Sequence, residues 1–182
     1  MNRDLETLLI KATKGVPPMK EPARKQRNQQ RLTECFPKFA EMLRAVIEDI
    51  EGQGFRPRIQ DAHRTIADQL IAFKTHKSKV TFGFHNVTGA GGKPEALAVD
   101  LLDDDNPLDP RRDYLIRLAA TAEKHGLQTG IFFDLDQSLR PRLRQAIADL
   151  NFDSAVKIGF DPTHVEVTGI SIAEAKAGKR PS

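Results

Sequence analysis

The sequence predicts an α+β fold in which a small antiparallel sheet is flanked by helices. Short strand-like runs alternate along the chain with segments of helical periodicity, which is typical of a mixed domain. The chain has 182 residues, of which 39% are hydrophobic and 29% charged, so its size suits one domain with a tail. No internal repeat is visible in the sequence.

The two ends of the chain are expected to differ from the middle. Residues 4–14 have the pattern of a short helix, which Pro17 and Pro18 interrupt, and the polar, basic residues around and after them predict a surface linker over 15–31. We therefore expect a basic N-terminal arm or linker over 1–31, a main domain over 32–173 and a flexible tail over 174–182.

Four helices are predicted, and in two of them, 33–52 and 111–125, apolar side chains recur at helical spacing. Thr33 is expected to cap the first, and Thr65 with Asp68 resembles a capping box at the start of the second. Gly126 suits the position just after the third, and Pro141 must lie in the first turn of the fourth. The predicted ranges are 33–52, 65–75, 111–125 and 138–150.

Strands are predicted where β-branched and other apolar residues form short runs bounded by turn residues. A glycine-rich loop over 88–95 separates the second and third of these runs. The predicted strands cover 55–62, 80–85, 97–102, 127–135, 156–159 and 164–168.

The charge distribution argues against a nucleic-acid surface on the main domain. The whole chain has a formal net charge of +3. Residues 1–31 contain eight Lys/Arg and three Asp/Glu, whereas residues 32–173 contain 17 Lys/Arg and 21 Asp/Glu. The basic charge is therefore concentrated at the ends, and we expect no nucleic-acid partner for the domain.

Several classes of protein are excluded by composition. A single cysteine, Cys35, excludes a disulfide framework and a zinc finger with several cysteines, and its place in an apolar helical pattern predicts a core residue. No run approaches the ~18 residues that a membrane span needs. The first residues lack the features of a signal peptide, so we expect synthesis in the cytoplasm.

Two histidines stand beside acidic residues in strand-like segments. Asp100 interrupts an apolar run after His85, and a buried carboxylate there needs a partner or a cation. His164 follows Asp161 by three residues and precedes an alternating strand pattern. His85, Asp100 and His164 form a possible zinc site with an open position for water. The alternative is a salt bridge between Asp100 and a lysine or arginine.

The other histidines and motifs point to structural roles. His125 lies at a helix end, His76 lies in a polar helix end, and His63 is a weak candidate for substrate contact. The sequence has no His-Glu-x-x-His or Gly-x-Ser-x-Gly segment, and its glycine-rich loop departs from a phosphate-binding loop.

Five sequence blocks occur together in a recognisable order. They are Arg64-Thr-x-x-Asp-Gln69, Ser78-Lys-Val-Thr-Phe-Gly-Phe-His85, Leu97-Ala-Val-Asp100, Ala122-Glu-Lys-His-Gly126-Leu127 and Asp161-Pro-Thr-His164-Val-Glu166. In this order the chain resembles the zinc peptidase family of D-alanyl-D-alanine carboxypeptidases and L-alanyl-D-glutamate endopeptidases. The resemblance is greatest to the VanY-like, phage endolysin branch and spans about residues 55–168.

The resemblance implies a hedgehog/D-Ala-D-Ala-peptidase-like fold and a role for each matching residue. His85, Asp100 and His164 are implied to bind Zn²⁺, and Asp161 to act as general base. Arg64 is implied to hold the substrate carbonyl and stabilise the oxyanion, and Ser78 to help bind substrate. Residues 32–173 are then the zinc peptidase domain of a monomer that cleaves a peptidoglycan stem peptide, and that acts on the cell wall if released from the cell.

The sequence also departs from the family pattern. Fourteen residues separate His85 from Asp100, where the family has a short glycine-containing turn, and an insertion follows Gly130. Glu166 is expected either to orient His164 or to pair with Arg64. The alternative functions are a D-Ala-D-Ala carboxypeptidase or dipeptidase, and a non-catalytic module that binds cell wall or another polyanion through its basic arm.

Overall fold

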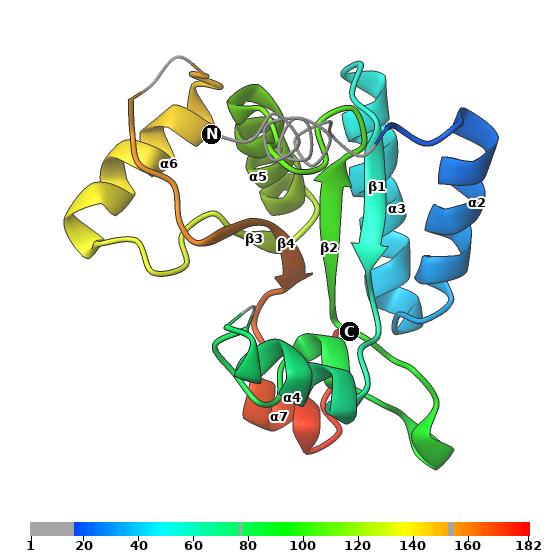
Figure 1. The fold of residues 1–182 in the computed structure, drawn as a ribbon. Helices are drawn as coiled ribbons and strands as arrows, with labels where there is room; N and C mark the ends of the chain where they lie inside the picture. The colour runs from blue at the N-terminus through cyan, green and yellow to red at the C-terminus, as the bar shows by residue number, and fades with distance from the viewer. Residues whose placement is uncertain (1–16, 77, 153–154) are drawn as a thin grey trace, which may run out of the picture.

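The fold is described here by a computed structural model that covers residues 17–76, 78–152 and 155–182 (Figure 1). The helix predicted over 4–14 lies outside these residues. Within them, no helix is both long enough and apolar enough to cross a membrane.

A four-stranded antiparallel sheet forms the centre of the molecule. Its strands are β1 (Pro57–Asp61), β2 (Ala98–Asp103), β3 (Leu127–Gly130) and β4 (Asp161–Val167), arranged in the order β1-β2-β4-β3. All three pairs of neighbouring strands are antiparallel. The predicted fold class, a small antiparallel sheet with flanking helices, is therefore confirmed.

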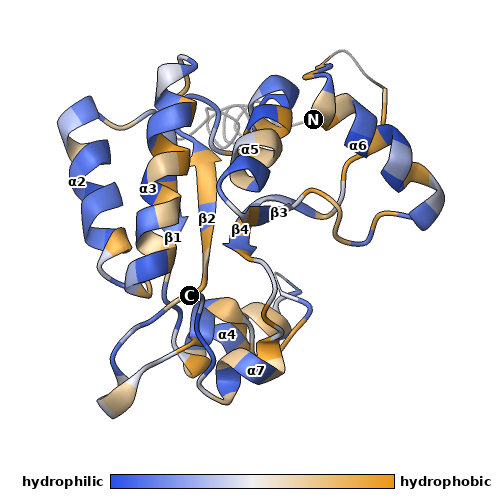
Figure 2. Ribbon diagram, turned by 180° about the vertical axis from the view of Figure 1, so that it is seen from behind, coloured by the Kyte–Doolittle hydropathy of each residue, from blue (hydrophilic) through white to orange (hydrophobic). Residues whose placement is uncertain are grey.

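Helices cover one face of this sheet and leave part of the other face open. Helices α3 (Pro37–Gly52) and α5 (Arg112–Lys124) lie behind the strands in Figure 1 and in front of them in Figure 2. A short 3₁₀ turn, η3 (Gln137–Leu139), leads into α6 (Arg140–Ala148), which packs against α5. Figure 2 shows β2 as largely hydrophobic, as expected for a central strand covered by helices. Fully buried core side chains include Phe39, Leu43, Ile50, Ile59, Leu101 and Leu118.

Two short helices lie together at one end of the sheet in both views. They are α4 (Ile66–Lys74) and α7 (Ile172–Lys176). The predicted start of α4 is confirmed, because the Thr65 hydroxyl accepts a hydrogen bond from the Asp68 backbone N–H at 3.1 Å. Gly126 has a φ of 74° just beyond α5, which is the conformation that favours glycine at a helix end.

The prediction of a surface linker over 15–31 is wrong for most of its described part. Residues Glu21–Leu32 form α2, which packs beside β1. Arg24 is 1% exposed, and its guanidinium donates to the carbonyl of Pro57 and to Glu21 and Glu51. The helix is held by polar contacts rather than by an apolar stripe, so hydrophobic periodicity did not reveal it. Thr33 ends α2 and does not cap α3, which begins at Pro37 after Phe36.

Three predicted strands are absent or shorter than expected. Residues 80–85 form a bend followed by a 3₁₀ helix, η1 (Phe84–Asn86). Residues 155–159 belong to no strand, and β3 ends at Gly130 instead of continuing to 135. A hydrophobic run alone cannot show which backbone groups find a strand partner. Beyond β3 the Gly159 N–H still donates to the Ile131 carbonyl at 2.7 Å, but no strand ladder forms there.

The expected flexible tail is ordered in the structure. A capping box between Ser171 and Glu174 begins α7, and Ala175 is 1% exposed. Arg180 then donates to the Glu95 carboxylate at 2.8 Å and to the carbonyl of Thr88. Arg180 thus links the last residues of the chain to the glycine-rich loop. The prediction of a flexible tail did not include this contact.

Candidate metal centre

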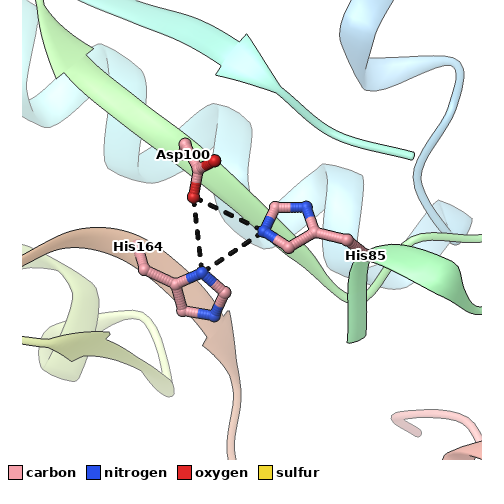
Figure 3. Close-up of side chains that lie close together, drawn as sticks. All are labelled: His85, Asp100 and His164. Atoms are coloured by element: carbon pink, nitrogen blue, oxygen red, sulfur yellow. Dashed lines mark hydrogen bonds and ion pairs between the residues drawn. The ribbon is translucent and has the colours of Figure 1, made fainter. Parts of the chain in front are cut away.

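The three predicted metal ligands meet on the open face of the sheet. Asp100 on β2 is paired in register with His164 on β4, so their side chains are cross-strand neighbours. His85 comes from η1 beside the strand ends. Figure 3 shows the Asp100 carboxylate pointing between the two imidazole rings.

The long insertion after His85 does not separate the ligands, because it folds outward and returns. The Leu97 N–H donates to the Phe84 carbonyl at 3.0 Å, and the Glu95 N–H donates to the Val87 carbonyl at 3.0 Å. Between these bonds the chain forms the short turn η2 (Ala90–Gly92). Residues adjacent to His85 and Asp100 are therefore brought together across the base of a loop.

The separations between the potential ligand atoms fit a tetrahedral metal site. His85 Nε2 lies 3.3 Å from His164 Nδ1, and Asp100 Oδ1 lies 3.4 Å from each of these nitrogens. Tetrahedral zinc with ligand bonds near ~2.05 Å places its ligand atoms ~3.3 Å apart. Two imidazole nitrogens and a carboxylate oxygen can therefore hold a metal ion without rearrangement of the cluster.

Neighbouring acceptors face one ring nitrogen of each histidine, so that the other ring nitrogen points into the cluster. His85 Nδ1 lies 2.6 Å from the carbonyl of Ala62 and donates to it, which leaves Nε2 free as a ligand. His164 Nε2 lies 2.9 Å from Glu166 Oε2, and Gln128 donates to the other oxygen of that carboxylate at 2.7 Å. Glu166 thus orients His164, which decides between the two roles expected for it.

The electrostatics of the cluster favour positive charge between its side chains. Burial favours the neutral form of Asp100, but the facing His85 and His164 outweigh it and hold its pKa below the ordinary value. Burial opposes charge on His164 as well, yet hydrogen bonds to Asp100 and Glu166 raise its pKa to about 10. The protein therefore stabilises positive charge at the position where the ligand atoms converge.

Asp161 and Arg64, the two predicted catalytic residues, line the same cavity as the cluster. This cavity has a volume of about 440 Å³. Burial raises the pKa of Asp161, and the nearby Asp100 charge raises it further.

Gly130 lies opposite Asp161 in the strand pairing, and a Cβ atom there would lie 2.1 Å from the Asp161 carbonyl oxygen. The close approach that positions Asp161 therefore requires glycine.

Several partners hold the Arg64 side chain in place, and the sequence did not indicate one of them, Asp61. Its Nε and Nη2 donate to Asp61 Oδ2 at 2.9 and 2.7 Å, and its Nη2 lies 3.4 Å from Asp100 Oδ2. Its Nη1 donates to the side chain of Gln69 at 3.1 Å. Asp61 ends β1 next to Asp100, so only the strand register could have identified it.

Hydrogen bonds also join the Arg64 segment to the His85 segment. The Arg64 N–H donates to the His85 carbonyl at 2.9 Å, and the Asn86 amide donates to the Arg64 carbonyl at 2.8 Å. Ser78, the predicted substrate-binding residue, lines the cavity and accepts a hydrogen bond from Gln69 at 2.8 Å. Its hydroxyl also donates to the Val80 carbonyl at 3.1 Å.

The remaining histidines and Cys35 lie outside the cluster. His125 contacts Asp49 at the end of α5, His76 is exposed, and His63 lines a separate hollow. Cys35 is buried, as predicted, and burial raises its pKa to about 12, as expected for an inert core thiol.

Comparison with known proteins finds a distant structural neighbour. No family model and no curated protein matches the sequence. Among solved structures, the crystal structure of the Serratia marcescens L-Ala D-Glu endopeptidase ChiX matches with a TM-score of 0.51 and 13% sequence identity. The match covers 78% of this chain and 86% of that chain. At this identity the likeness shows a shared fold and a distant structural relationship, and not membership of the VanY-like family.

Proposed function

We propose that this protein is a zinc-dependent peptidase that hydrolyses peptidoglycan stem peptides, with the L-Ala-D-Glu bond as its target. The observation that carries the proposal is the spacing of His85 Nε2, Asp100 Oδ1 and His164 Nδ1, which are 3.3 to 3.4 Å apart at the wall of a cavity. The fold shared with an L-Ala D-Glu endopeptidase supports the substrate class.

His85, Asp100 and His164 would hold the zinc ion, since nitrogen and oxygen ligands of this kind are typical of catalytic zinc sites. When bound, zinc supplies Lewis-acid polarisation of the scissile carbonyl and makes water acidic enough to react near neutral pH. Glu166 and the Ala62 carbonyl keep the two imidazoles in the ligand tautomer throughout.

Asp161 is the general base of the proposed mechanism. Its raised pKa makes its carboxylate a better proton acceptor than an exposed aspartate. It takes a proton from the attacking water and delivers it to the leaving amine. The pairing of β3 with β4 around Gly130 keeps this carboxylate at the cavity wall.

Arg64 stabilises the negative charge that develops on the carbonyl oxygen. Asp61 and Gln69 hold the guanidinium in place before substrate arrives, so little reorganisation is needed during the reaction. Removing a preorganised donor of this kind typically costs about 10²–10³ in kcat.

Metal analysis combined with digestion of purified cell wall tests the proposal. The wild type is expected to bind one zinc per chain and to release peptides from the wall. Asp161→Asn should keep the zinc and lose activity, His164→Ala should lose both, and the exposed control His76→Ala should lose neither. Intact wall after incubation with the zinc-loaded wild type would refute the peptidase, and the masses of released peptides distinguish an endopeptidase from a D-Ala-D-Ala carboxypeptidase.

A further inference from the structure

The wall of the cavity away from the metal cluster carries a lysine that the proposed mechanism does not use. Lys79 Nζ forms an ion pair with the carboxylate of Asp134 and lies 4.6 Å from the centre of the Phe160 ring. All three residues line the same cavity as His164 and Asp161. The ammonium group therefore belongs to the space into which a substrate must enter.

Lys79 is more available to a ligand than the other cation of this wall. Among the described residues that line the cavity, Arg64 and Lys79 are the lysine and arginine side chains. Most of the N–H groups of Arg64 are engaged by Asp61, Asp100 and Gln69, and its side chain is 20% exposed. The side chain of Lys79 is 59% exposed and that of its partner Asp134 is 52% exposed. An exposed ion pair of this kind contributes little to stability and can exchange its anion.

The surroundings of Lys79 hold its ammonium group at the wall of the cavity. Phe160 directly precedes Asp161, and its backbone N–H donates to the Phe133 carbonyl at 2.8 Å. The aromatic face holds the ammonium by a cation–π contact, whether or not Asp134 is bound to it. Lys79 thus lines the cavity that Asp161 also lines, and its own contacts are with Asp134 and Phe160.

We propose that Lys79 binds a carboxylate of the substrate next to the scissile bond, so that the enzyme selects acidic peptides. Asp134 occupies the ammonium group in the free protein, and the substrate carboxylate displaces it on binding. This inference rests on the proposed peptidase function and assigns a specificity-determining residue to the same cavity.

Two peptides that differ at one group test the assignment. Both are analogues of the stem peptide, and the residue that supplies the leaving amine has a free carboxylate in one and a carboxamide in the other. The zinc-loaded wild type is expected to favour the carboxylate about tenfold in kcat/KM, the usual value of one charge-assisted hydrogen bond. Lys79→Gln should remove this preference by raising KM for the carboxylate peptide, with kcat and the rate on the carboxamide unchanged.

Two further variants sharpen the test. Asp134→Asn removes the competing anion and should strengthen the preference, whereas the control Lys124→Gln, an exposed paired lysine on α5, should leave it unchanged. Equal cleavage of the two peptides by the wild type, or an equal loss on both in Lys79→Gln, would overturn the assignment but not the peptidase. Calorimetry measures the binding of both peptides directly. If the carboxylate peptide binds in a Lys79-dependent way but is not cleaved, the result would support the acidic subsite and refute the peptidase.

Discussion

At the scale of single residues, the site depends on groups that hold the ligands rather than on the ligands alone. Each imidazole of the cluster directs one nitrogen at the proposed metal position and the other at a fixed acceptor, the Ala62 carbonyl or the Glu166 carboxylate. Partners of this kind set both the orientation and the basicity of a metal-binding histidine. The cluster is therefore preorganised by the chain around it.

Replacing Glu166 by Gln should weaken zinc binding without unfolding the protein. The amide keeps the size of the side chain but no longer supplies the negative charge that faces His164 Nε2 at 2.9 Å. Loss of such a partner typically costs about 10–100-fold in metal affinity. Chelator competition measures the effect, with the exposed Glu48→Gln as control. An unchanged dissociation constant would show that Glu166 does not support the ligand.

Zinc affinity should also increase with pH. In the metal-free site, hydrogen bonds to Asp100 and Glu166 outweigh burial and raise the pKa of His164 to about 10, so the ring is protonated at neutral pH. Nδ1 must lose its proton before it can bind a metal, so each unit of pH between 6 and 9 should tighten binding by about tenfold. Titration calorimetry in buffers of different ionisation enthalpy measures the released proton. A constant affinity and no proton release over this range would contradict the assigned ligand atom.

At the scale of elements, β3 and β4 place Asp161, the proposed general base, by a close backbone contact. Gly130→Ala would put a Cβ atom 2.1 Å from the Asp161 carbonyl oxygen, so the strand end must shift. We expect kcat to fall at least about tenfold, because a base that is displaced by ~1 Å loses its alignment with the substrate. The zinc content should be retained. Gly52→Ala is the matched control, since nothing lies within 4 Å of a Cβ there. Equal kcat for both variants would show that the contact does not position Asp161.

Elements with local signals could be predicted, and those held by distant partners could not. Helix α4 has its own Thr65 cap, and helix α5 has a buried apolar face with Gly126 just beyond its end, so the sequence indicates both correctly. Helix α2 depends on the contacts of Arg24 and Asn28 with β1, which only the folded chain brings together. The order of the five sequence blocks predicted the cluster, but Asp61 and Lys79 depend on strand register and loop conformation, for which the sequence has no signal.

At the scale of the whole molecule, the described part of the basic N-terminal segment belongs to the fold. Arg24→Ala should lower the free energy of unfolding by about 1–3 kcal/mol, because the buried Pro57 carbonyl loses one donor and the partly exposed Glu21 and Glu51 lose the guanidinium that they share. Denaturant titration measures this loss. The neighbouring Lys25→Ala is the control, since its side chain is 58% exposed and its ion pair is 3.6 Å long. Equal stability of the two variants would show that α2 is only an attached arm.

Helix α2 and the last residues of the chain both contact segments that lead to the site. Helix α2 fastens to β1, which ends at Asp61 beside Arg64, and the Arg180 contacts fasten the chain end to the loop between His85 and Asp100. Segments from most of the described chain therefore support one cavity, as expected of a fold whose function lies in a single site.

Digestion of a defined muropeptide by the zinc-loaded protein, followed by mass spectrometry, tests the proposed activity. We expect a single product pair with the masses of cleavage between L-Ala and D-Glu, lost on chelation and restored by zinc. An intact muropeptide in the presence of protein that holds one zinc per chain would contradict it.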